Sequence, residues 1–207
     1  MTDQLDDSAL PPIDELVARA RDLTLEPASR ILPAAHGLRV AHLLEQMASA
    51  EASGNHELVL LGCRPIIETS AFGLYYATHP DEVGRAIKGH QIDLASLSKF
   101  FESASLPEEL DGVNGPGPLT WDQAWHSYIS VSGSSIEVEY LKQWYKGISS
   151  VGLHGGFGAV QNYVSELDGL PVPNPKPAPM IEAQGCLDLC TSLLGLLIEA
   201  VEGIHNE

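Results

Sequence analysis

The stretch HELVLLGCRPIIETSAFGLYYATH, at residues 56–79, decides the fold of this chain. Apolar side chains occupy nearly every side of a helix drawn through it, whereas a surface helix carries them on one stripe. Such a helix has to be covered by other elements on several sides. Pro65 lies inside the stretch and predicts a kink that releases the carbonyl near Leu61. The stretch therefore predicts the central helix of a bundle.

Further helices are predicted on both sides of this stretch, because apolar positions recur there with helical spacing. Prolines or capping residues stand where several of these helices begin, and Gly54 and Gly133 stand where two of them end. Few segments alternate with strand period, and no repeat at fixed spacing is found. The predicted helices are residues 12–23, 33–53, 80–103, 120–133 and 181–204, a helix with a capping-box start at 134–148, and a further helix at 157–167.

The predicted fold class is all-α, a single-domain bundle of about six or seven helices. A chain of 207 residues is within the size of one domain. Residues 1–10 are polar and acidic and are expected to form a flexible tail, so the helical domain covers residues 11–207. Prolines and glycines predict loops at 105–119 and 168–180.

The charge balance is strongly acidic, with 28 Asp and Glu against 11 Lys and Arg and a formal net charge of -17. Such a surface repels phosphate backbones, and no run of basic residues offsets it. We therefore expect no broad binding to duplex DNA. A locally basic cleft or a basic partner protein is compatible with this charge.

Cysteine usage and hydropathy predict a cytoplasmic protein. Cys63, Cys186 and Cys190 are odd in number and lie in apolar helical contexts, so a reducing compartment and buried thiols are expected. Neither the N-terminal residues nor any uncharged stretch has the pattern expected of a signal peptide or a membrane span, and no membrane association is predicted.

Two groups of polar residues within apolar helices form the candidate site. Arg64 and Glu68 are four residues apart and share one face of the central helix, where their apolar neighbours lead us to expect burial. Tyr145, Ser149 and His154 fall on successive turns of a later segment. Buried polar groups need partners, so the five side chains are expected to meet between helices.

The chemistry of this cluster has two interpretations. A hydroxyl beside an imidazole can act as a nucleophile with its base, and Asp122 or Glu139 could orient His154. Alternatively, the serine bonds back to its own helix, Arg64 and Glu68 form an ion pair that fixes helix register, and the cluster is purely structural. Phosphate-binding loops, zinc-hydrolase motifs and di-iron motifs are absent from the sequence, so neither a cofactor nor a metal is predicted.

The motifs RPIIE at 64–68, WYKGISS at 144–150 and HG at 154–155 resemble those of a family of bacterial all-helical proteins that is similar to the HEPN superfamily. The resemblance covers roughly residues 58–164. It implies a helical bundle, frequently dimeric, that acts in bacterial defence or stress response. It also implies either a metal-independent ribonuclease or a degenerate, non-catalytic relative. In the catalytic case His154 would transfer the proton and Arg64 would stabilise phosphate charge.

HEPN nucleases use an arginine followed by four to six residues and a histidine at the dimer interface. Arg85 with His90 and Arg30 with His36 have this spacing, and the first pair is the reserve site. The resemblance thus implies a homodimer, with RNA as one partner class.

Two alternatives from other classes stay open. The chain could be a non-enzymatic acidic adaptor whose helices bind a partner protein. It could also bind a small molecule beneath the loop at 105–119, with Trp121 and Trp125 as aromatic walls.

Overall fold

The computed structural model describes residues 10–23, 28–83, 120–135, 137–148, 164–167, 170–173 and 181–204. Within these ranges the chain forms six α-helices, one 3₁₀-helix and a helical segment at residues 80–83, which confirms the predicted all-α bundle. The helical elements are α1 (Ile13–Arg21), η1 (Ala28–Arg30), α2 (Ile31–Ala52), α3 (His56–Thr78), α7 (Trp121–Ser132), α8 (Val138–Ile148) and α10 (Ile181–Glu202). The predicted tail, apart from Leu10, lies outside the described residues. So do the loop at 105–119 and residues 84–103 of the helix predicted at 80–103.

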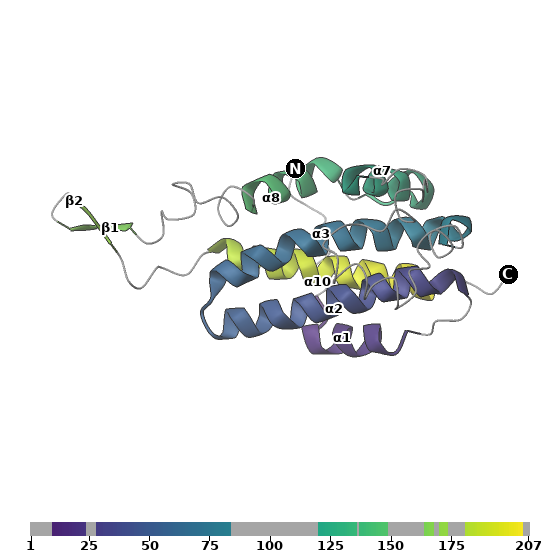
Figure 1. The fold of residues 1–207 in the computed structure, drawn as a ribbon, viewed down its shortest axis with the longest axis horizontal. Coiled ribbons are helices and arrows are strands. Elements are labelled where there is room, and N and C mark those ends of the chain that lie inside the picture. The colour runs from purple at the N-terminus through teal and green to yellow at the C-terminus, as the bar shows by residue number, and fades with distance from the viewer. Residues whose placement is uncertain are drawn as a thin grey trace, which may run out of the picture.

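Helix α3 is central, as the sequence predicts. It packs against α2, α10, α7 and α8, and α1 packs on α2 and α10. Figure 1 shows α2, α10 and α3 side by side, with α1 on one side of this group and α7 and α8 following one another along the other side of α3. A helix that is apolar on nearly all sides is thus covered on nearly all sides.

Local signals set the ends of α3. Asn55 caps the first turn, because its side chain accepts a hydrogen bond from the Leu58 amide at 3.3 Å. Gly54 takes a positive φ of 73° in the turn from α2, a conformation that glycine adopts without strain. At the other end Pro80 disfavours helical geometry at His79, so the helix stops at Thr78. The helix runs through Pro65 as one element.

The core is one continuous cluster contributed by every α-helix of the described residues. Cys63, Cys186 and Cys190 are buried free thiols within it, as expected. A hydrogen bond to Cys63, together with burial, raises the pKa of the Cys186 thiol, which therefore stays protonated and unreactive. The largest fully buried side chains are Trp125, Leu16, Leu44, Met47, Ile66, Ile67, Leu74, Leu141, Leu194, Leu197, Ile198 and Val40.

The junction of α7 and α8 differs from the prediction. Gly133, with φ of 67°, ends α7 as expected, but α8 starts at Val138 and not at Ser134. The Ser134 amide donates instead to the Ser132 hydroxyl at 3.2 Å, and the carbonyl of Glu137 accepts the first helical hydrogen bonds of α8. The Ser132 hydroxyl therefore takes part in the turn that follows α7.

The predicted helix at 157–167 is wrong at its C-terminal end. Val164–Leu167 forms strand β1, which pairs antiparallel with β2 at Leu170–Pro173. In the sequence the two strands flank Asp168 and Gly169, and Asp-Gly is a preferred dipeptide for two-residue hairpin turns. That signal outweighs the short helical pattern before it.

Two of the described helices have the length and composition of membrane spans: His56–Thr78 and Glu182–Glu202, with mean hydropathies of 1.2 and 1.4. Inside the bundle, 56% and 50% of their most apolar windows are buried. Core helices of soluble proteins pass the same test, so this finding does not assign either helix to a membrane.

The helices α2, α3 and α10 all lie close together at Gly73. A Cβ atom there would lie 2.8 Å from His36 Cβ on α2 and 2.9 Å from Leu197 Cδ1 on α10. The absence of a side chain on α3 thus permits its contact with both neighbours. A methyl group at this point would force the three helices apart.

Gly73→Ala should lower the free energy of unfolding by about 1–3 kcal/mol, because the added methyl overpacks this contact. Urea denaturation monitored by circular dichroism measures the change. Gly195→Ala is the matched control: no atom lies within 4 Å of a Cβ built there, so helix propensity should stabilise that variant by up to about 1 kcal/mol. Equal destabilisation of both variants would contradict the close-approach explanation.

Candidate functional site

Three of the five predicted site residues meet at one carboxylate. Glu68 Oε1 accepts a hydrogen bond from Arg64 Nε at 3.2 Å and another from the Tyr145 hydroxyl at 2.5 Å. Arg64 and Glu68 lie one turn apart on α3, and Tyr145 is on α8, 77 residues beyond Glu68. The resemblance motifs at 64–68 and 144–150 are therefore joined by direct contacts.

Stacking of planar groups extends this cluster to a third helix. The guanidinium carbon of Arg64 lies 4.5 Å from the centre of the Tyr145 ring, a cation–π distance. Trp121, the first residue of α7, stacks on the same tyrosine with ring centres 4.7 Å apart and planes inclined by 26°. Arg64, Glu68, Tyr145 and Trp121 form what we call the Arg64 cluster.

The expectation that Arg64 and Glu68 are buried is wrong. Their side chains are 37% and 38% exposed. The apolar neighbours that suggested burial, such as Ile66 and Ile67, point to other sides of α3 and are themselves buried. The ion pair lies at the edge of the cover that α7 and α8 provide, where solvent limits its contribution to stability.

Protonation states follow from this setting. Burial and the adjacent Glu68 carboxylate raise the pKa of Tyr145 above its ordinary value, so the phenol is a hydrogen-bond donor at neutral pH. The hydrogen bond from Arg64 to Glu68 raises the pKa of the Arg64 guanidinium, which is a permanent cation. The cluster thus contains a permanent guanidinium group that a carboxylate and an aromatic face hold in place.

Ser149 and His154 lie outside the described residues, so the structure does not place these two members of the predicted site. The two carboxylates considered as partners for His154 are engaged with one lysine: Lys142 Nζ lies 3.1 Å from Glu139 and 3.7 Å from Asp122. A hydrogen bond from the Thr120 hydroxyl, at 2.5 Å, lowers the pKa of Asp122. Asp122 and Lys142 therefore join the start of α7 to α8.

Arg30 and His36 each contact backbone carbonyls. Arg30 donates to the carbonyls of Glu202 and Ile204 at the end of α10. His36 Nδ1 lies 2.7 Å from the Leu32 carbonyl, its ring lies against Tyr76, and burial lowers its pKa. The two side chains serve different helix contacts. The reserve pair, Arg85 and His90, lies outside the described residues.

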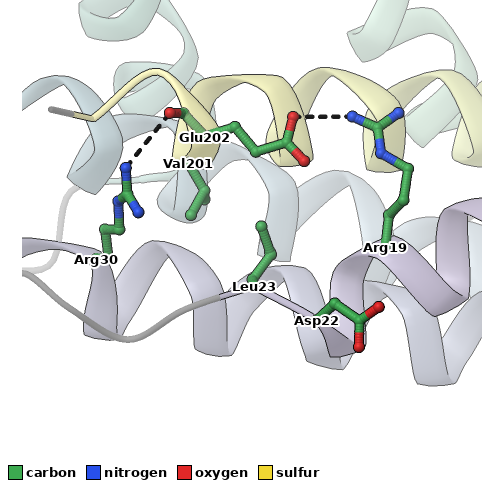
Figure 2. A pocket seen from close by; sticks show the side chains of 6 residues that line it. All are labelled: Arg19, Asp22, Leu23, Arg30, Val201 and Glu202. Carbon is green, nitrogen blue, oxygen red and sulfur yellow. Dashed lines mark hydrogen bonds and ion pairs between the residues drawn. The ribbon is translucent and has the colours of Figure 1, made fainter.

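A hollow of about 230 Å³ lies between α1, η1 and the end of α10. Figure 2 shows its lining, in which Arg19 pairs with the Glu202 carboxylate at 2.9 Å and Arg30 contacts the Glu202 carbonyl. Cations interact favourably with the C-terminal end of a helix. The guanidinium groups of Arg19 on α1 and Arg30 on η1 therefore stabilise the packing of the end of α10 on these elements. Asp22, Leu23 and Val201 complete the lining.

The sequence did not predict two contacts near the site, the stack of Trp121 on Tyr145 and the ion pair of Lys142 with Asp122. Trp121 and Trp125 look alike in an aromatic stripe, yet Trp125 is fully buried core and Trp121 stacks on the tyrosine of the cluster. Trp121 stands in the first turn of its helix, where the cover over α3 begins. Among the described side chains, no group of three His, Cys, Asp or Glu is placed to hold a metal ion.

Comparison with known proteins gives no match to a protein family, a curated protein or a solved structure. The resemblance to HEPN proteins thus depends on the short motifs in residues 64–68 and 144–155.

Tyr145→Phe should lower the free energy of unfolding by about 1 kcal/mol, because it removes the hydrogen bond to Glu68 and keeps both ring stacks. Folding raises the pKa of Tyr145, so the phenol favours the folded state below the unfolded pKa of 10.0 and loses this effect as the pH rises through the folded value. The difference from wild type, measured by urea denaturation, should therefore shrink in strong alkali.

Tyr140→Phe is the control for this prediction, since Tyr140 lies five residues earlier on α8 and is 51% exposed. Its change should stay within about 0.5 kcal/mol. A loss at Tyr140 as large as that at Tyr145 would show that the hydrogen bond to Glu68 is not the cause.

His36→Phe should reduce the loss of stability at mildly acidic pH. Burial lowers the pKa of His36 below the ordinary value of 6.5 in the folded state, so protons bind first to the unfolded chain as the pH falls. Wild type should accordingly become less stable below about pH 6.5. Thermal unfolding at a series of pH values tests this, and an unchanged acid slope in the variant would assign the effect to other groups.

Proposed function

We propose that this chain is a HEPN-like helical protein of bacterial defence or stress response, and that the Arg64 cluster is part of an RNA-directed site. The observation that supports the proposal is the position of Arg64: a half-exposed cation, held by Glu68 against the face of Tyr145. The motifs that carry the resemblance supply all three residues. A homodimer in the cytoplasm belongs to the same proposal.

The cluster suits single-stranded RNA better than a duplex. Unpaired bases stack on aromatic rings and on guanidinium planes, and Tyr145 with Trp121 provides adjacent aromatic rings beside such a plane. Arg64 has one guanidinium nitrogen committed to Glu68, and its remaining donors can meet a phosphate. Glu68 then acts as a positioning residue, because it fixes the guanidinium without touching RNA.

The proposed chemistry is proton transfer at a phosphodiester. In the proposal His154 is the general base and acid, and Arg64 stabilises negative charge on the phosphate in the transition state. Tyr145 holds Glu68 through its hydroxyl and is not itself a base, since its raised pKa keeps it protonated. A degenerate relative would keep the Arg64 cluster and bind RNA without cleaving it.

Arg64→Ala and His154→Ala should each lower RNA cleavage, or toxicity on expression, by about 100-fold or more, because general acid–base catalysis and transition-state charge stabilisation are each of that size. Cleavage of a labelled single-stranded RNA measures the rate, and the melting temperature shows whether the fold is intact. Arg39→Ala, an exposed arginine on α2, is the matched control and should cleave like wild type. Unchanged cleavage in both site variants would refute the assignment.

A second candidate, an acidic adaptor for a basic partner protein, is favoured by how the cations are used. Arg19, Arg21, Arg64 and Lys142 each form an ion pair with a carboxylate of the chain itself. These charges are neutralised in place, and binding to a phosphate backbone requires cations that can exchange partners. A basic protein segment meets no such obstacle on this surface.

The same variants separate the two candidates. For an adaptor, Arg64→Ala and His154→Ala would lower the melting temperature, partner affinity would follow stability alone, and wild type would neither cleave nor bind RNA.

A further inference from the structure

A second polar pair, outside the Arg64 cluster, joins α3 to α7. Ser127 Oγ lies 3.2 Å from Nε2 of His79, across 48 residues of sequence. Ser127 is within α7, and His79 is the residue that caps the C-terminal end of α3. Both residues are partly exposed.

The surroundings of His79 determine which ring nitrogen carries the proton. Nδ1 lies 2.9 Å from the Tyr75 carbonyl, which can only accept a hydrogen bond. It also lies 3.0 Å from the Thr78 hydroxyl, whose own proton is directed to the carbonyls of Leu74 and Tyr75. Nδ1 must therefore be the donor in the neutral imidazole, which leaves the lone pair of Nε2 facing Ser127.

The ring is also held in orientation. It stacks on the Tyr75 ring with centres 4.3 Å apart and planes inclined by 19°. The backbone places it there, because Pro80 turns His79 out of the helix and lets the side chain fold back over the last turn of α3. The imidazole is thus fixed by a carbonyl, a hydroxyl and an aromatic face, as the base of a nucleophile–base pair must be.

The Ser127 hydroxyl differs in its contact from those of Ser130 and Ser192. A hydroxyl inside a helix usually donates to a carbonyl of the preceding turn, as Ser130 does to Ser127 and Ser192 does to Asp188, each within 2.9 Å. The Ser127 hydroxyl instead meets a nitrogen lone pair on another helix. That contact is the one that raises the nucleophilicity of a serine.

We propose that Ser127 is a nucleophile toward activated esters, with His79 as its general base. In the reaction the Ser127 oxygen forms a bond to the electrophilic carbon or phosphorus, and its proton passes to Nε2 of His79. The bond to the leaving group breaks, and the leaving group departs with the electron pair. The product is an acyl or phosphonyl ester of Ser127, with the imidazolium stabilised by the Tyr75 carbonyl at Nδ1. This activity is independent of the RNA-directed function proposed above.

A fluorophosphonate probe tests the proposal on the full-length protein. Attack by Ser127 forms an oxygen–phosphorus bond and releases fluoride, and peptide mass spectrometry locates the label. Label is expected on Ser127 and should be lost in Ser127→Ala. The labelling rate should fall at least about tenfold in His79→Gln and in His79→Phe, since a general base contributes that much or more. The phenylalanine keeps the ring stack on Tyr75 but has no base.

Ser130→Ala is the matched control, because Ser130 lies one turn further along α7 and bonds only to its own helix in the described contacts. It should be labelled at the wild-type rate, and circular dichroism melting shows that each variant is folded. Absence of label from Ser127 in the wild-type protein, or a fall of less than about tenfold in both folded His79 variants, would overturn the proposal.

Discussion

The burial of α3 is the constraint on which the rest of the structure depends. A helix that is apolar on nearly all sides cannot face water on any broad side, so the chain must supply cover from several directions. Helices α2 and α10 cover it on one side, and α7 and α8 cover it on the other. The contact is close enough at Gly73 that the helices leave no room for a methyl group.

Both polar sites lie where this cover stops. Arg64 and Glu68 lie on a strip of α3 that α7 and α8 reach only at their edge, and His79 lies at the end of the helix. In each case one side chain from the covering helices, Tyr145 or Ser127, completes the hydrogen bonding of a group on α3. The polar contacts position α7 and α8 on α3, and the favourable free energy of packing comes from the buried apolar surface.

Helical periodicity was sufficient to predict the bundle and the central helix, and the need of polar side chains for partners predicted the contact of Tyr145 with Glu68. Apolar neighbours in the sequence did not predict which side of α3 is buried. Arg64 and Glu68 are close in sequence to the buried Ile66 and Ile67 but lie on another, partly exposed side of the helix. Helical periodicity missed β1 and β2, whose signal is the Asp168–Gly169 dipeptide between them rather than an apolar period. It also missed His79 with Ser127, since only the packing of α7 on α3 brings them together.

The use of arginine and lysine within the chain has a consequence for its behaviour in solution. Arg19, Arg21, Arg64 and Lys142 are committed to carboxylates of the same molecule, so most of the excess negative charge is left to the solvent. The protein behaves as a polyanion surrounded by a diffuse atmosphere of mobile cations, whose thickness shrinks as salt is added. Two copies repel each other through this atmosphere at low ionic strength, so self-association has to be driven by short-range contacts and is helped by added electrolyte.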